Sequence, residues 1–535
     1  MLCALADRGQ ASPRFAVPLN CNRDQLPAGP PSSIIGAQPG PTRIEELFMR
    51  RYDLIIRGGT VATAADTFSA DLAVKDGKVA ALGLGLDGAD REIDATGHFV
   101  LPGGIDTHAH IEQIASNGML NADTFETATR SAAFGGTTSV ICFACQHRGD
   151  SLKAVYEDYS ARARRGAIID YSFHLLLTDP TPTVLNEELP PLVAEGNASI
   201  KVFMTYDLMN IGDEALLDIL LKARELGALV AVHAENNGMI SWLGKRLVER
   251  GYTDAKYHAV SHPRASEPEA INRLIAFAEL LDQPVIVYHV ATGEGAAVIR
   301  EARGRGVKVY GETCTQYLFL TAQDLDRPGG EGAKWVCSPP LRTTADQEAL
   351  WQALALGDLQ LVSSDHAPYT LDERGKYAHG PVPSFKRTAN GMPGLETRLP
   401  MLFDAMVTRG RFGINKFVQW TATEPARIYG LGDRKGTLAI GADADIAIWD
   451  PSQRVTLTDD LVHDNTGYTP FAGRTITGWP TTVLRRGETI IADGECQAAA
   501  GSGAYLPRRG GEAATPSGRL SPEFDPERNF GAKLY

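Results

Sequence analysis

Residues 101–110 read LPGGIDTHAH, and this stretch decides the fold that we expect. It is an apolar run, broken by two glycines, that ends in His108 and His110. Side chains two residues apart on a β-strand point to the same face, so these two imidazoles suit chelation of one metal ion. In a (β/α)8 barrel the catalytic groups stand at the carboxyl ends of the strands, which is where this pair would lie.

Outward from this stretch, the chain alternates between strand-like and helix-like segments. Eight apolar runs separated by helical segments are the sequence signature of a (β/α)8 barrel. The rival fold is a doubly wound sheet, but no GxGxxG follows the first strand to support it. The strand-like runs are 99–106, 138–144, 169–177, 199–206, 228–234, 284–290, 306–312 and 359–365. The helix-like segments are Phe125–Phe134, Leu152–Arg165, Leu185–Glu195, Asp213–Leu226, Glu267–Leu281, Gly295–Arg303 and Ala345–Leu356.

The two ends of the chain differ from this middle part. Short strands with glycine turns occupy 52–100 and return at 445–492, which indicates one small β-sandwich domain built from both chain ends. The first 50 residues are rich in Pro, Gly, Ser and Ala without a period. The predicted parts are a flexible N-terminal arm (1–50), the sandwich (51–100 and 435–495), the barrel (101–434) and a C-terminal tail (496–535).

Composition excludes several classes of protein. The net charge of −13 argues against general nucleic-acid binding, because phosphates favour an excess of Lys and Arg. No run approaches the ~18 apolar residues of a membrane span, and no secretory signal is seen at the start. Seven scattered cysteines do not form the framework of a secreted disulfide protein. We therefore expect a cytoplasmic protein without nucleic-acid or membrane partners.

Four further strand-like runs deliver polar groups to the expected site. Lys201 lies inside an apolar run, where an unpaired ammonium is costly. His233, His289 and Asp365 each stand at the end of another run. Together with His108 and His110, these side chains would face one pocket. Imidazoles, a carboxylate and a modified lysine suit a pair of divalent metal ions of the zinc type.

The residues that carry these groups resemble the cyclic amidohydrolases, and within them the dihydropyrimidinases and hydantoinases. The resemblance runs from about residue 52 to about residue 490. The superfamily motifs are THAH (107–110), KVFMTY (201–206), HAE (233–235), YHV (288–290) and SDH (364–366). The motifs of the narrower group are GETCTQYL (311–318), SPPLR (338–342) and NGMPGLETR (390–398).

The resemblance implies an activity, a set of cofactors and a role for each residue. His108, His110 and Asp365 would hold one zinc-type ion, and His233 and His289 the other. A carbamylated Lys201 would bridge both ions, and a bridging hydroxide would attack the amide carbon of a small cyclic substrate. Asp365 would move the proton and the Tyr206 hydroxyl would polarise the carbonyl. The backbone at Ser338 and Asn390 would bind the amide edge of the ring.

Two alternatives stay open at this point. Ala367-Pro368 is closer to allantoinases and dihydroorotases, whereas Tyr206 and the 314–318 stretch favour the hydantoinases. A non-catalytic scaffold of the same fold is the alternative outside the enzyme class, although all six ligand positions are filled. The expected reaction is therefore ring opening of hydantoins or dihydropyrimidines to N-carbamoyl amino acids.

Several smaller expectations concern loops, core residues and assembly. We expect Glu112 and Gln113 to meet the ring substituent, so that the carboxylate repels anionic substrates. His366 either orients Asp365 or packs. The resemblance implies a homotetramer, and the aromatic residues of the tail are candidates for docking on a neighbouring subunit. Cys142, Cys145 and His174 are interpreted as core residues.

Overall fold

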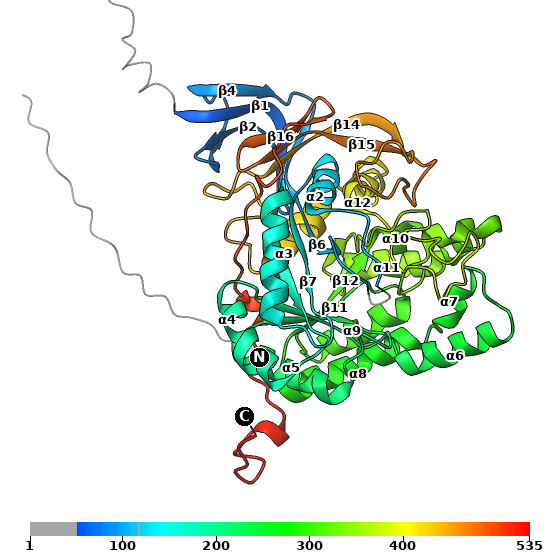
Figure 1. Cartoon of the computed structure of the whole chain (residues 1–535). Helices are drawn as coiled ribbons and strands as arrows, with labels where there is room; N and C mark the ends of the chain where they lie inside the picture. Colours follow the sequence, from blue (N-terminus) through cyan, green and yellow to red (C-terminus); the bar gives the residue numbers. More distant parts are fainter. Residues whose placement is uncertain (1–50, 116–117, 535) are drawn as a thin grey trace, which may run out of the picture. The chain divides into compact units, whose positions relative to one another are not determined.

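The computed structural model describes residues 51–115 and 118–534. The predicted arm over 1–50 lies outside these residues. Eight parallel strands follow one another in sequence order, and a bridge between Ala109 and His366 brings the last strand back to the first. The strands are β6 (Gly104–Ala109), β7 (Thr137–Cys145), β8 (Asp170–Leu176), β9 (Ser199–Phe203), β10 (Leu229–His233), β11 (Val285–Val287), β12 (Val309–Cys314) and β13 (Leu361–Ser363). The predicted (β/α)8 barrel is confirmed (Figure 1).

The first predicted strand, 99–106, is in fact two strands that belong to different sheets. β5 (Phe99–Pro102) pairs with the terminal strands, and β6 begins the barrel. Gly103 joins them, and a Cβ there would lie 2.2 Å from Thr138 Oγ1. This close approach explains the glycine, and the chain passes from one sheet to the other at this point.

Helices lie between the barrel strands and after the last of them. The longer ones are α2 (Phe125–Phe134), α3 (Leu152–Gly166), α5 (Asp213–Leu226), α6 (Asn237–Glu249), α8 (Ser266–Leu281), α9 (Gly293–Gly304), α11 (Thr344–Leu356) and α12 (Leu395–Phe403). The shorter ones are α4 (Leu189–Ala194), α7 (Tyr257–Ser261), α10 (Thr315–Phe319), α13 (Ile414–Val418), α14 (Glu424–Ile428) and α15 (Gly511–Ala514). The segment predicted at Leu185–Glu195 is a π-helical turn, η1 (Val184–Glu188), followed by α4. Further short helical segments are η2 (Ala322–Leu325), η3 (Pro328–Trp335), which is kinked at Gly329 and Gly330, η4 (Asp404–Thr408), η5 (Gln419–Thr423) and η6 (Pro522–Phe524).

Two of the longer helices, α6 and α12, were not predicted from the sequence, and they differ in burial. Helix α6 buries only Ile240 and Gly244, while its large apolar residues Met239, Trp242 and Val248 are exposed. Helix α12 is buried at every residue and contains Pro400, so its pattern has neither a polar face nor an unbroken helical signal. No helix in the described ranges is long and apolar enough to span a membrane.

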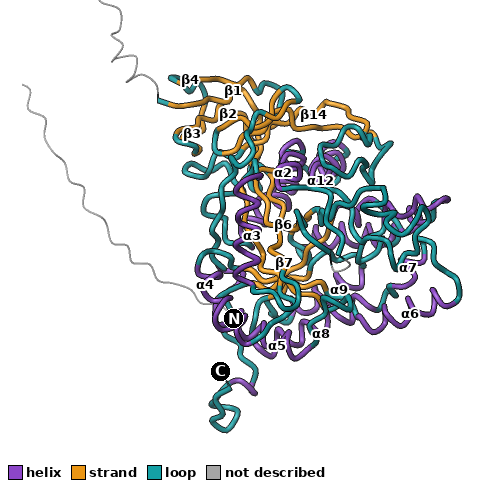
Figure 2. Tube along the Cα trace, viewed as in Figure 1, coloured by secondary structure: helices purple, strands orange, loops and turns teal. Residues whose placement is uncertain are grey.

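Strands from both chain ends form a second, mixed sheet (Figure 2). The early strands are β1 (Tyr52–Ala62), β2 (Thr67–Lys75), β3 (Lys78–Gly83), β4 (Ala89–Asp94) and β5; the late ones are β14 (Ile446–Thr456), β15 (Thr475–Arg485), β16 (Glu488–Ala492) and β17 (Glu495–Cys496). The join is the antiparallel pair of β5 and β14. The strands are hydrogen-bonded as one sheet rather than as two separate ones. A bulge between Ile56 and Gly59 interrupts the register of β1, and the sheet has a hydrophobic core of its own.

The C-terminal segment docks on the barrel of its own chain. Leu506 N donates to Tyr171 O at 2.7 Å, and Tyr171 N donates to Ala504 O at 2.9 Å. The guanidinium of Arg508 is buried and donates to the hydroxyls of Ser172 (2.7 Å) and Ser199 (2.9 Å). Docking of the tail's aromatic residues on a neighbouring subunit stays a prediction, because the residues that contact the barrel here precede those aromatic residues. Phe530, further along, is fully exposed.

Candidate active site

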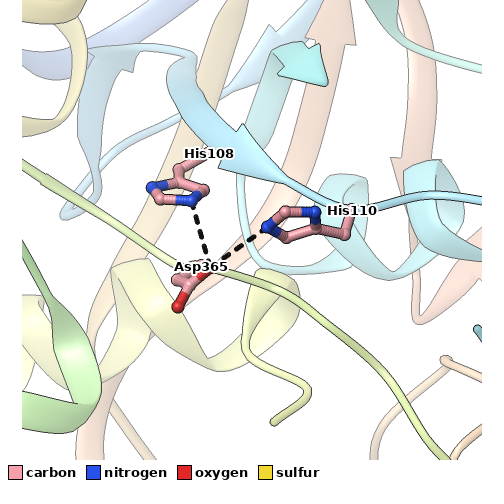
Figure 3. A group of neighbouring side chains, drawn as sticks. All are labelled: His108, His110 and Asp365. Carbon is pink, nitrogen blue, oxygen red and sulfur yellow. Dashed lines mark ion pairs between the residues drawn. The ribbon is translucent and has the colours of Figure 1, made fainter. Parts of the chain in front are cut away.

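His108, His110 and Asp365 form the first candidate metal group. The two histidines lie at the end of β6, and Asp365 follows β13. Asp365 Oδ1 is 3.1 Å from His108 Nε2 and 3.5 Å from His110 Nε2 (Figure 3). The ligand atoms of the three residues lie within 4.8 Å of one another, as donors bound about 2 Å from one shared ion would.

Second partners hold these two imidazoles in orientation. His108 Nδ1 lies 2.6 Å from Glu312 Oε1, and His110 Nδ1 lies 2.7 Å from Gln113 Oε1. Each contact leaves Nε2 pointing toward Asp365. A carboxylate or carbonyl oxygen on the far nitrogen is the usual support of a metal-binding histidine. The sequence next to the ligands supplies the partner of His110, whereas the partner of His108 comes from a distant strand, β12.

His233, His289 and Lys201 form the second candidate group. His233 ends β10, His289 follows β11, and their ring centroids are 4.2 Å apart. His233 Nε2 lies 2.9 Å from Glu235 Oε2, so Nδ1 is the nitrogen left for a ligand. The rings of His289 and His108 are 5.4 Å apart, which places the two groups side by side.

Lys201 is fully buried in β9, and its ammonium has no hydrogen-bond partner in the described part of the chain. Its Nζ lies 4.3 Å from the ring centroid of Tyr288 and 4.8 Å from that of Phe203. Burial lowers the pKa of Lys201 to about 7, against the opposing effect of Asp365 and Glu312. An uncharged amine is the form that can react with carbon dioxide.

The donor set fits divalent metal ions. Burial lowers the pKa of His108, His233 and His289 well below the ordinary value, which keeps the imidazoles in the neutral form that binds metals. His289 Nδ1 and Lys201 Nζ are buried, and neither has a hydrogen-bond partner among the residues that the structure describes. Leaving such atoms unsatisfied costs about 1–3 kcal/mol each, a cost that metal binding or carbamylation would remove.

A second set of potential ligands stands behind His108. Glu312 and Cys314 are both buried next to it. Burial raises the pKa of the Cys314 thiol well above the ordinary value, so it stays protonated and is a poor ligand. Glu312 accepts from Thr107 Oγ1 at 3.2 Å and contacts His108, which makes it a support for that imidazole rather than a third metal group.

Three residues of this site have left-handed backbone conformations. The φ angles are 67° at Tyr206, 42° at His289 and 48° at Asp365. Residues other than glycine adopt this region rarely, and mostly where the surrounding structure holds them there. Such strained positions gather at functional sites because they direct a side chain where regular strand geometry cannot.

A cavity of about 240 Å³ opens above the two groups. Tyr206, Ser338 and Asn390 line it together with the four histidines and Asp365. Burial raises the pKa of Tyr206, and nearby Glu235 adds to this effect, so the hydroxyl remains a donor. Asn390 Oδ1 is buried and lacks a partner within the described ranges. The structure therefore brings every predicted site residue except Lys201 to the cavity wall, and Lys201 is buried against the rings of Tyr288 and Phe203.

The prediction that Glu112 meets the ring substituent is wrong. Its carboxylate accepts from Phe125 N at 2.9 Å, at the start of α2, and lies 3.9 Å from Arg162 Nε. Glu112 does not line the cavity, whereas Gln113 does. A helix N-terminus attracts a carboxylate, and this local attraction decides the direction of the side chain. Glu112 is therefore not placed to repel anionic substrates.

The structure also shows which of the remaining histidines and cysteines pack in the core. His174 is buried between Ser199 Oγ (2.7 Å) and Thr107 O (3.0 Å), so it is a satisfied core histidine. His366 packs: its Nε2 lies 3.0 Å from Asp123 Oδ2, and its Nδ1 accepts from Gly394 N. Cys142 and Cys145 are buried and unpaired. These findings confirm the interpretation of the two cysteines and His174 as core.

Three residues that support the histidines were not predicted in that role from the sequence. Glu312 orients His108, Glu235 orients His233, and Gln113 orients His110. Glu235 stands two residues after its histidine and Gln113 three residues after His110, and this spacing is a usable signal. Glu312 lies 204 residues from His108 in the chain, so only its place at the end of β12 could have indicated it.

Over most of its length, the sequence is similar to one family profile and to curated proteins. The sequence profile of the amidohydrolase family matches residues 99–490. The D-hydantoinase of Rhizobium radiobacter is 43% identical over 461 residues, which cover 85% of this chain and 99% of that protein. The D-hydantoinase of Geobacillus stearothermophilus is 42% identical, with 85% of this chain and 96% of that protein covered.

Solved structures extend the likeness to the fold. The dihydropyrimidinase of Brevibacillus agri NCHU1002 has a TM-score of 0.83 and 42% sequence identity, with 85% of this chain and 99% of that chain covered. The L-hydantoinase of Arthrobacter aurescens has a TM-score of 0.77 and 28% identity, with 85% and 100% covered.

Proposed function

Because the chain belongs to the amidohydrolase family and, within it, to the hydantoinases and dihydropyrimidinases, we propose that it opens the ring of hydantoins or dihydropyrimidines. Water adds to a ring carbonyl carbon, the C–N bond breaks, and the product is an N-carbamoyl amino acid. The observation that carries the proposal is the unpartnered, buried Lys201 beneath four histidines and Asp365 at one end of the barrel. A non-catalytic scaffold would have no reason to keep this set.

The proposed cofactors are two divalent ions of the zinc type. His108, His110 and Asp365 would hold one, and His233 and His289 would hold the other. Carbamylation by carbon dioxide would convert the Lys201 amine into an anionic ligand for these ions, which would give its unpartnered Nζ a role. When bound, such ions supply a water of lowered pKa and polarise a carbonyl oxygen.

The side chains of the cavity perform the remaining steps. Burial raises the pKa of Asp365, but His108 and His110 lower it further, so the carboxylate is ionised and can accept the proton of the attacking water. Asp365 then delivers that proton to the leaving nitrogen. The Tyr206 hydroxyl donates to the carbonyl oxygen as negative charge develops there. Ser338 and Asn390 hold the amide edge of the ring.

The test combines metal analysis with a panel of substrates. Lys201→Ala is expected to remove most of the metal and the activity, while exposed Lys153→Ala, the matched control, retains both. The panel is hydantoin, dihydrouracil, allantoin and dihydroorotate, followed by the absorbance change on ring opening. Retention of full metal content and rate by Lys201→Ala would overturn the carbamate. If allantoin or dihydroorotate is the best substrate, the alternative indicated by Ala367, which lines the cavity, replaces the hydantoinase assignment.

Two properties of the whole protein belong to the same proposal. A cytoplasmic location agrees with the five described cysteines, which are all unpaired. The tetramer implied by the resemblance stays a prediction, and light scattering at micromolar concentration would test it.

A further inference from the structure

The mouth of the cavity carries a charge that the reaction does not use. Apart from the candidate metal ligands, the lining residues that the structure describes are neutral except for one formal charge, the ammonium of Lys386. Lys386 lies in the loop before Asn390 and is exposed. Its positive charge therefore stands beside the space into which a substituent on the ring would project.

Neighbouring residues position the Lys386 side chain, but none of those described forms an ion pair with its ammonium. A Cβ at Gly244 of α6 would lie 2.9 Å from Lys386 Cε, so the missing side chain of this glycine makes room for the lysine stem. Asp207 lines a neighbouring hollow together with Lys386. Asp207 Oδ1 instead accepts from Asn237 and Ser241, both at 3.4 Å, and no ion pair to Lys386 forms among the described residues.

No other acid balances this charge at the cavity wall. Asp365 is the only carboxylate among the lining residues that the structure describes, and it is engaged with His108 and His110. Glu112 is turned toward α2. Asn121 also lines the cavity; its Oδ1 accepts from Gln113 N at 2.6 Å, which leaves its NH2 group as a second donor.

We propose that Lys386 selects substrates whose ring substituent ends in a carboxylate. The preferred substrates would then be hydantoins that carry an acidic side chain at ring position 5. This inference rests on the proposed ring-opening function. The amide edge of the ring is common to all such substrates, so discrimination must come from the substituent. An ammonium at a partly enclosed mouth attracts an anion in the encounter and in the bound state, and it does so more weakly as salt increases.

The experiment uses two substrates of nearly equal shape. These are 5-(2-carboxyethyl)hydantoin, which is anionic, and 5-(2-carbamoylethyl)hydantoin, which is neutral. The measured quantity is the ratio of kcat/KM for the acid to kcat/KM for the amide, with each enantiomer taken separately. We expect Lys386→Gln to lower this ratio by about three- to tenfold, Lys386→Glu to lower it further and Lys386→Arg to preserve it.

Arg387→Gln is the matched control. It removes the same charge one residue away, at an exposed position that does not line the cavity, and we expect it to leave the ratio unchanged. Raising the salt concentration should lower the ratio in the unmodified protein and not in Lys386→Gln.

The outcomes separate the two proposals. If the unmodified protein opens neither compound, nor any simple hydantoin, the proposed function fails. If it opens both and Lys386→Gln leaves the ratio unchanged, the role of Lys386 is overturned while the function stands. A change of equal size in Arg387→Gln would also overturn it, because the effect would then come from the general surface charge.

Discussion

At the scale of single residues, the site depends on side chains that the backbone holds in unusual directions. Tyr206, His289 and Asp365 all have positive φ angles, a conformation that costs of order 1–3 kcal/mol per residue. The packed barrel compensates this cost. The Tyr206 ring lies 5.3 Å from that of His233, which brings its hydroxyl to the cavity over the second candidate group.

We predict that Tyr206→Phe lowers kcat by about 10²- to 10³-fold, the usual effect of losing one donor to a developing oxyanion. Phenylalanine keeps the ring and its packing, so metal content should not change. Steady-state kinetics and metal analysis on the same preparation measure both quantities. An unchanged kcat would show that the hydroxyl takes no part in the chemical step, and a loss of metal would show that the residue is structural.

At the scale of an element, the N-terminus of α2 decides the direction of the Glu112 side chain, which the sequence did not specify. Thr124 caps the helix, and the carboxylate of Glu112 accepts from Phe125 N at its first turn. Arg162 of α3 adds a bond from Nη1 to Glu112 O at 2.9 Å. The loop after β6 is thereby tied to two helices, and Gln113 rather than Glu112 faces the site.

Glu112→Ala should therefore lower the free energy of unfolding by about 1 kcal/mol, because a helix N-terminus loses an acceptor. The same variant should leave the relative kcat/KM values for anionic and neutral substrates unchanged. Urea unfolding and the substrate panel provide the two readouts. Glu126→Ala removes a half-buried carboxylate that pairs with Arg130 of the same helix, and it should cost at most about 0.5 kcal/mol. A shift in substrate preference in Glu112→Ala would instead show that Glu112 does repel anionic ring substituents.

At the scale of the whole molecule, distant parts of the chain are held together by buried charges. Lys435 Nζ lies 2.8 Å from Asp170 Oδ2 in the barrel and 2.6 Å from Asp445 Oδ2, next to β14 of the mixed sheet. The C-terminal segment adds Arg508, whose buried guanidinium bonds two serine hydroxyls and the carbonyl of Phe173. The ends of the chain thus stabilise the barrel that carries the site.

Arg508→Met should lower the free energy of unfolding by about 2–3 kcal/mol, because it removes charge-assisted hydrogen bonds from buried hydroxyls. The midpoint of urea unfolding measures this effect. Arg509→Met changes the exposed neighbour and should stay within about 0.5 kcal/mol of the unmodified protein. Equal stability of the two variants would mean that the docked segment contributes nothing to the barrel.

The sequence by itself determined the eight barrel strands and the order in which polar groups reach their ends. Strand residues alternate with a period of two, and parallel strands present their carboxyl ends at one rim, so His108, His110, His233, His289 and Asp365 had to meet there. The apolar run around Lys201 likewise required a buried lysine, and the structure buries it completely.

Only the tertiary structure decided where loop and tail side chains point. Glu112 and Lys386 lie outside regular elements, where no periodicity specifies a face, and their directions follow from partners such as Phe125, Arg162 and Gly244. Arg508 reaches the barrel 336 residues away from Ser172 in the chain. Such contacts depend on long-range packing rather than on local pattern, which is why the place of Lys386 at the cavity and the docking of the C-terminal segment became visible only in the folded chain.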